Sequence, residues 1–206
     1  GPDDSGVWLD TGVAFAHRRL AIIDIAAGKQ PMRCASGRWV LIFNGEIYNF
    51  LDLKRGILSN YPYKTESDTE VILAALELWG EEALARLEGM FALAAWDTQQ
   101  KRLLLARDGH GIKPLYFANI ETDFVFGSEV GALLAAGVKP EVDESNLDVF
   151  LDLRFVPSPN TLFNGVKKLP PGHSIWIDFD GFAREPMPFQ FDAPLIERTG
   201  SESQLM

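Results

Sequence analysis

The sequence lacks several features that would place it in common classes of protein. Cys34 is the only cysteine in 206 residues, so no intrachain disulfide can form and a reducing setting is expected. No apolar run reaches about 18 residues, and no basic segment followed by an apolar one opens the sequence. We therefore expect a cytoplasmic protein that is neither exported nor embedded in a membrane.

Basic residues are also scarce. Lys and Arg number 19 against 29 Asp and Glu, which gives a formal net charge of -10. No cluster of Lys and Arg stands out, and because phosphate neutralisation needs one, nucleic acid is not an expected partner. His17, His110 and His173 lack metal-ligand spacing with one another or with Cys34, so no metal site is predicted.

The sequence does contain the material for a sizeable core. Hydrophobic residues make up 47% of it, with 14 Phe and 5 Trp, a composition that argues against disorder. Apolar periodicity predicts strands within residues 13–25, 39–43, 90–96, 103–106, 115–117, 124–126 and 173–179, and helices within 50–58, 71–79, 81–87, 130–136 and 146–153. Antiparallel strands with helices between them indicate an α+β layered domain rather than a βαβ unit.

The two ends of the sequence carry their own expectations. The sequence opens with the turn-like Gly1-Pro2-Asp3-Asp4 and not with Met, so we expect the natural chain to begin upstream. Periodicity fades after Phe189, and the last residues are polar and rich in Ser and Gly. We predict one domain over residues 1–185 and a tail or linker over 186–206.

The most informative segment follows the apolar run 39–43. Asn44-Gly45 is a frequent two-residue hairpin turn, which is one interpretation. Against it, the residues after Glu46 do not alternate like a return strand and lead into a predicted helix. The other interpretation is that the Asn44 amide and the Gly45 N–H are two donors for one oxygen, with Gly allowing close approach of the backbone.

Two further charged positions have both an ordinary and a functional interpretation. Arg18 and Arg19 interrupt an apolar segment, where a charge usually faces solvent, yet a guanidinium is also well suited to clamping a carboxylate. Asp68 begins a predicted helix as a capping residue, but could equally accept an ammonium. Together with Glu46, these side chains would suit a free amino acid that carries a side-chain amide.

Other candidates are weaker. Arg107-Asp108, ahead of Gly109, is typical of a polar turn at the end of a strand, with part of an interface as the alternative. Cys34 has no neighbour in sequence that would activate a thiol, so we interpret it as structural. The sequence therefore shows no candidate nucleophile.

These motifs resemble those of the glutaminase domain of asparagine synthetases, within the class II glutamine amidotransferases. The resemblance covers residues 1 to about 180 and consists of separated motifs in family order. The matching stretches are Gly1 to Gly6, His17 to Asp24, Gln30 to Met32, Phe43 to Asn49, Ser67 to Glu70, Gly89 to Ala92, Arg107-Asp108, Gly111 to Tyr116, Ser128-Glu129 and Leu169 to His173.

The resemblance implies an αββα sandwich of the N-terminal nucleophile hydrolase type, here without its N-terminal strand. In the family, a Cys exposed as the first residue attacks the side-chain amide of L-glutamine. Its α-amino group acts as the base, because such an amine titrates at about 7.7–8.0. An absent central strand would leave an open, apolar sheet edge and a tendency to aggregate.

The resemblance also implies roles for residues of this chain. Arg19 would bind the glutamine carboxylate, and the main chain of Leu20, Ala21, Ile22 and Ile23 would form the wall of the pocket.

The remaining implied roles fall on two segments further along the chain. Asn44 and Gly45 would form the oxyanion hole, and Glu46 and Asp68 would hold the α-amino group.

Two parts of the family pattern are absent from this sequence. The opening Cys-Gly-Ile segment would lie about thirty residues before the Gly-Pro-Asp motif, and the synthetase domain would follow in cis. ATP and Mg are expected only for that synthetase domain, which would use the ammonia to amidate aspartate, so no cofactor is expected in this chain.

We expect the 206-residue chain to be inactive alone, as a fragment lacking the nucleophilic Cys. The alternatives are a class II amidotransferase with a different acceptor and a non-catalytic glutamine-binding remnant. Assembly as a homodimer is left open.

Overall fold

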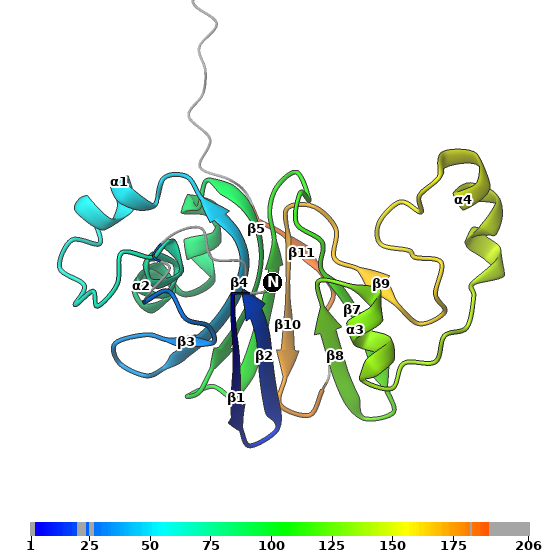
Figure 1. Ribbon diagram of the computed structural model, residues 1–206, viewed down its shortest axis with the longest axis horizontal. Coiled ribbons are helices and arrows are strands. Elements are labelled where there is room, and N and C mark those ends of the chain that lie inside the picture. Colours follow the sequence, from blue (N-terminus) through cyan, green and yellow to red (C-terminus); the bar gives the residue numbers. More distant parts are fainter. Residues whose placement is uncertain (1–2, 20–23, 25–26, 182, 190–206) are drawn as a thin grey trace, which may run out of the picture.

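The computed structural model describes residues 3–19, 24, 27–181 and 183–189 (Figure 1). Its strands are β1 (Asp4–Asp10), β2 (Val13–Arg19), β3 (Met32–Arg33), β4 (Trp39–Ile47), β5 (Gly89–Asp97), β6 (Arg102–Arg107), β7 (Tyr116–Ile120), β8 (Asp123–Gly127), β9 (Lys167–Lys168), β10 (His173–Asp178) and β11 (Met187–Pro188). Its helices are α1 (Phe50–Arg55), α2 (Asp68–Trp79), α3 (Val130–Ala135) and α4 (Leu147–Leu153), with 3-10 turns η1 (Gly80–Arg86) and η2 (Glu144–Asn146). None of the helices in these ranges is long and apolar enough to cross a membrane.

A six-stranded antiparallel sheet forms the centre of the molecule, in the order β11-β10-β6-β5-β4-β3. β4 and β5 contribute uninterrupted apolar runs because both of their faces are covered. On one face, α2 and the turn η1 pack on the sheet through residues such as Leu41, Ile72, Leu84 and Leu93, all of which are buried.

The other face of this sheet packs against a second layer of strands. This layer consists of the β1–β2 hairpin and the three-stranded sheet β8-β7-β9. Phe15 from β2 and Phe126 from β8 meet edge to face there, with ring centroids 5.9 Å apart. α3 covers the outer face of β7 and β8 through Leu133 and Ala118. The order of layers is helix, sheet, sheet, helix, which confirms the predicted αββα fold.

Helix α2 ends where the sequence predicted but begins at Asp68, ahead of the predicted range 71–79. Ser67 is its N-cap, and the Ser67 hydroxyl accepts a hydrogen bond from the Thr69 N–H at 3.1 Å. The helix ends before Gly80, whose N–H donates to the Leu76 carbonyl. This fixed start is important for the site because Asp68 is the first residue of the helix.

The structure corrects the predicted end of one strand and adds a strand that was not predicted. β4 does not stop at Phe43 but continues to Ile47, paired with β5 throughout. Asn44-Gly45 is therefore neither a hairpin turn nor a strand end, because Gly45 allows β5 to approach closely. β1 was not predicted, since the side chains of Val7 and Leu9 point outward and disguise its alternation.

The structure also decides between the two interpretations of Arg107-Asp108. The Arg107 guanidinium donates to the carbonyls of Lys113, Leu169 and Gly111 at 2.6 to 2.7 Å.

The neighbouring Asp108 side chain accepts from the backbone N–H groups of Phe91, His110, Ile112 and Lys113 at 3.0 to 3.2 Å. The pair of residues is buried and holds the loop over residues 109–114. It is structural.

Candidate active site

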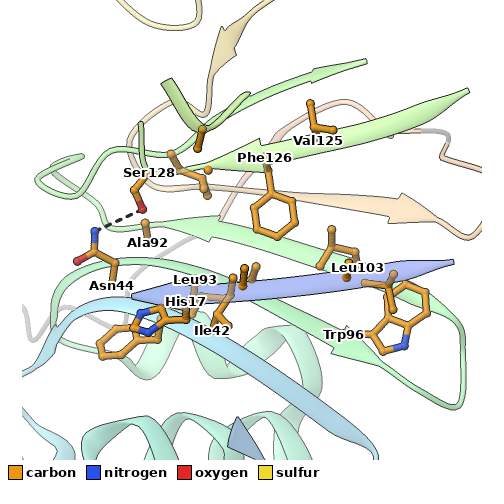
Figure 2. Close-up of a pocket in the computed structure, with 18 of the residues that line it drawn as sticks. His17, Ile42, Asn44, Ala92, Leu93, Trp96, Leu103, Val125, Phe126 and Ser128 are labelled. Carbon is orange, nitrogen blue, oxygen red and sulfur yellow. Dashed lines mark hydrogen bonds between the residues drawn. The ribbon is translucent and has the colours of Figure 1, made fainter. Parts of the chain in front are cut away.

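A large cleft separates the two parts of the second layer. Its volume is about 1320 Å³, its sides are β2 and β8, and its floor is formed by residues of β4, β5, β6 and β10. β2 pairs with β1 along one edge, and β8 pairs with β7 along one edge. In the part of the chain that the structure describes, no strand pairs with the other edge of β2 or of β8. Figure 2 shows apolar side chains such as Ile42 and Leu103 along the cleft, with Asn44 and Trp96 toward opposite ends. The cleft combines an apolar floor with unpaired strand edges, as an extended segment would need.

One end of this cleft is bordered by the polar segment of β4. Gly45 lies opposite Phe91 in the β4–β5 ladder. The N–H and the carbonyl of Phe91 are both engaged by Asp108. The Gly45 N–H therefore points to the other edge of β4, away from β5.

The neighbouring N–H groups on that edge are both occupied. The Phe43 N–H donates to Gln30 Oε1 at 2.6 Å, and the Ile47 N–H donates to Asp68 Oδ2 at 3.1 Å. Residues two apart in a strand direct their N–H groups the same way, so the Gly45 N–H lies between these two bonds. The edge thus presents one backbone donor flanked by two side-chain acceptors.

The side chains of Asn44 and Glu46 lie on the cleft side of the sheet. They continue the alternation of Val40 and Ile42, which pack into the core beneath the second layer. The Asn44 Nδ2 atom donates to the Ser128 hydroxyl at 3.5 Å, a contact from the end of β8 (Figure 2). The amide of Asn44 and the N–H of Gly45 therefore border the same end of the cleft.

The position of Gly45 leaves no room for a side chain. A Cβ atom there would overlap the carbonyl oxygen of Met90 and lie 2.8 Å from the Phe91 Cα atom. Glycine is therefore required by the packing of β5 as well as by any approach of a ligand to the backbone. The sequence suggested only the second reason.

Asp68 is placed for more than capping. Asp68 is only 5% exposed. Its carboxylate accepts a hydrogen bond from the Ile47 N–H of β4, while Ser67 caps the helix. Burial, with a smaller contribution from the nearby Glu46 carboxylate, raises the pKa of Asp68 above its ordinary value of 3.8. Among the described residues no cation pairs with it, so a bound ammonium would relieve this electrostatic cost.

Arg19 lies at the end of β2 and borders the same cleft. It is 7% exposed, and its Nη2 atom donates to the Asp24 carbonyl at 3.0 Å. The cleft is therefore bordered by Arg19 as well as by Asn44, Glu46 and Asp68, the four side chains that the sequence analysis singled out.

Leu20, Ala21, Ile22 and Ile23, whose main chain was predicted to form the wall of the pocket, lie outside the described residues. Cys34 is on the other face of the central sheet, in the core under α2, where its sulfur accepts from the Trp39 N–H at 3.1 Å.

Many residues border the cleft without having been predicted as site residues, among them Gln30, Ser128 and His17. All three stand in stretches that matched the family motifs, which was the only sequence signal for Gln30 and Ser128. Burial lowers the pKa of His17, so its ring is neutral at pH 7.

Comparison with known proteins gives a consistent family. The model of the glutamine amidotransferase domain matches residues 1–187. The chain is 42% identical over 182 residues to "Asparagine synthetase [glutamine-hydrolyzing] 1" of Bacillus subtilis, covering 88% of this chain and 29% of the relative. It is 43% identical over 187 residues to a putative glutamine-hydrolysing asparagine synthetase of Mycobacterium tuberculosis, covering 84% of this chain and 29% of that relative. The chain thus spans less than a third of the length of these relatives.

Solved structures share the fold at lower sequence identity. The glutamine phosphoribosylpyrophosphate amidotransferase of B. subtilis superposes with a TM-score of 0.61 at 21% identity, covering 87% of this chain and 35% of that one. A structure described as the allosteric regulatory enzyme of purine biosynthesis gives a TM-score of 0.63 at 20% identity, with the same coverage of 87% and 35%. At this identity the likeness shows the fold alone.

Proposed function

The chain belongs to the family of glutamine amidotransferase domains, and from this premise we propose that its cleft binds L-glutamine for amide hydrolysis in an asparagine synthetase. The observation that carries the proposal is the edge of β4. There the Gly45 N–H lies between two occupied N–H groups, beside the Asn44 amide and the buried Asp68 carboxylate.

We assign the parts of glutamine by their charge. The α-carboxylate binds Arg19, with the main chain of residues 20–23 as the wall of the pocket. The α-ammonium lies between Glu46 and Asp68, where it offsets the cost of burying the Asp68 carboxylate. The side-chain amide then reaches Asn44 and Gly45.

The chemistry requires a thiol that the described part of the cleft does not contain. We propose that it is an N-terminal Cys of a strand outside these 206 residues, with its α-amino group as base. Its sulfur adds to the amide carbon, and the oxygen becomes an oxyanion held by the Asn44 Nδ2 group and the Gly45 N–H. Collapse of this intermediate expels ammonia and leaves a thioester, which water hydrolyses to glutamate.

The whole-protein assignment is part of the same proposal. Residues 1–185 form the glutaminase domain and 186–206 lead toward a synthetase domain, where ATP and magnesium would activate aspartate for amidation. The length of the relatives supports this arrangement, because about 70% of each lies outside the matched region.

Calorimetric titration of the 206-residue chain with L-glutamine tests the binding half of the proposal. Binding is expected, with a loss of affinity of at least about tenfold, or 1.4 kcal/mol, in Asp68→Asn and Arg19→Ala. Asp52→Asn, on the distant helix α1, is the matched charge control and should bind as the parent does. Equal binding by all four proteins, or no binding by the parent, would contradict the proposed site.

The catalytic half is tested by supplying the missing strand. The chain alone should release no glutamate from glutamine. A synthetic extended peptide beginning Cys-Gly-Ile is expected to restore glutamate release, and the same peptide beginning with Ser should not. Glutamate release by the chain alone that survives Cys34→Ala would show that the nucleophile has been wrongly assigned.

A further inference from the structure

Gln30 connects two parts of the proposed site. This side chain is 9% exposed and precedes β3. Its Oε1 atom accepts from the Phe43 N–H at 2.6 Å, and its Nε2 atom donates to the Thr69 hydroxyl at 3.4 Å. Phe43 is followed by Asn44, and Thr69 is preceded by Asp68. A single amide therefore bridges the strand that carries the oxyanion donors and the helix that carries the carboxylate.

Asp24 makes a second connection on the other side of Asp68. Its backbone carbonyl accepts from Arg19 Nη2 at 3.0 Å, and its Oδ2 atom accepts from the Glu66 N–H at 2.9 Å. Its Oδ1 atom accepts from the Ala27 N–H at 3.0 Å. The backbone hydrogen bonds from Glu66 and Ala27 lower the pKa of Asp24 below its ordinary value. This residue therefore joins the end of β2 to the segment that leads into α2.

From these contacts we propose that Gln30 and Asp24 are positioning residues that set the separations of Arg19, Asn44 and Asp68. The inference rests on the proposed function, since those three residues are its glutamine ligands. Neither positioning residue is assigned a contact with the substrate.

The reasoning is geometric. Glutamine has its carboxylate and ammonium on one carbon and its amide three bonds further along, so the three groups that bind it must keep fixed distances. They stand on three separate elements, β2, β4 and α2, and misplacement by about 1 Å costs about a hundredfold in rate. Gln30 joins β4 to α2, and Asp24 joins β2 to α2. The two bridges together therefore set the distances between Arg19, Asn44 and Asp68.

The two ends of the Gln30 bridge can be tested separately. Gln30→Met keeps the length of the side chain without its polar atoms, and Thr69→Val removes only the hydroxyl. Both are expected to weaken L-glutamine binding about three- to tenfold, and Thr69→Ser, which retains the hydroxyl, should restore it. Ser174→Ala is the matched control, because it removes another buried hydroxyl donor, to Glu81, on the far side of the central sheet.

The Asp24 bridge has its own pair of variants. Asp24→Ala removes the acceptor of the Glu66 and Ala27 N–H groups and is expected to weaken glutamine binding about three- to tenfold. Glu77→Ala is the control, because the Glu77 carboxylate accepts from the Ser36 N–H at 3.1 Å, remote from the cleft. The control should lose similar stability and no affinity.

Amide hydrogen exchange provides a readout that does not depend on glutamine. Exchange at Phe43 should accelerate in Gln30→Met, and exchange at Glu66 should accelerate in Asp24→Ala. If these rates rise while the affinity for glutamine stays at the parent value, the positioning role is overturned. If the parent does not bind glutamine, the proposed function fails, and unchanged exchange at Phe43 and Glu66 would then also overturn the bridges.

Discussion

At the scale of single residues, the chemistry of Asp68 is altered by its surroundings. Burial and the Glu46 carboxylate raise its pKa above 3.8. A carboxyl group whose pKa is raised on folding binds its proton more tightly in the folded state. Its ionisation therefore lowers the stability of the fold as pH rises through the raised pKa. A cationic ligand reverses this effect by lowering the pKa again.

The affinity for L-glutamine should therefore depend on pH. An ammonium next to Asp68 favours its charged form, so binding releases a proton wherever the free protein still holds one. We expect affinity to rise as the pH is raised from about 4 and to level off once the free carboxyl has ionised. Calorimetry in buffers of different ionisation enthalpy would measure the proton release. A pH profile for Asp68→Asn as steep as that of the parent would exclude Asp68 as the source.

Gly45 leads to a prediction about stability. Gly45→Ala places a Cβ atom against the Met90 carbonyl and Phe91, which should lower the free energy of unfolding by about 1–3 kcal/mol. Gly131→Ala is the control, since nothing lies within 4 Å of a Cβ at that helical position. It should be neutral or stabilising by up to about 1 kcal/mol. Urea denaturation of both variants measures the difference, and equal stability would show that β5 can move away from β4.

At the scale of elements, the loop over residues 109–114 depends on one carboxylate. Asp108→Ala would remove the acceptor of four backbone N–H groups. We expect a loss of at least about 3 kcal/mol in the free energy of unfolding, because buried donors would be left without partners. Asp143→Ala, which removes the exposed acceptor at the start of η2, should cost about 1 kcal/mol. A similar loss in both variants, measured by urea denaturation, would contradict the structural role of Asp108.

The elements that the sequence predicted well are those with a local cause. Helix α2 follows from its apolar stripe, the Ser67 cap and the terminal Gly80, all of which lie within fourteen positions of one another. The β5–β6 hairpin follows from two apolar runs around a polar turn. In these cases the residues that determine the element are its own.

The features that the sequence did not predict have causes that lie elsewhere in the chain. β4 continues past Asn44 because the Met90–Phe91 backbone packs directly on Gly45, and no property of residues 44–47 reveals it. The bridge from Gln30 to Thr69 spans 39 positions. Contacts at such separations are set by the packing of layers. Residue types alone therefore suggested Arg19, Asn44 and Asp68 as candidates, but gave no sign of the bridge that joins their elements.

At the scale of the whole molecule, stability is expected to be uneven. The central sheet and α2 share a continuous buried core. Helix α4 has no buried residue, and Leu151, Leu153 and Phe155 at and after its end are 53%, 51% and 56% exposed. A helix of 7 residues is marginal in water without packing to support it. The segment that carries α4 (Figure 1) should therefore unfold locally far more often than the central layers.

Hydrogen exchange followed by mass spectrometry measures this difference. Amides of α2 and β5 are expected to exchange only through global unfolding, and those of α4 through local opening that costs little free energy. Asp108→Ala should accelerate exchange in β5 and leave α4 unchanged, because α4 already exchanges without unfolding the core. Protection of α4 equal to that of α2 in the isolated chain would mean that another surface covers it. Dilution would then identify the covering surface. Protection of α4 by a second copy of the chain should fall as the protein is diluted, whereas protection by contacts within one chain should not change.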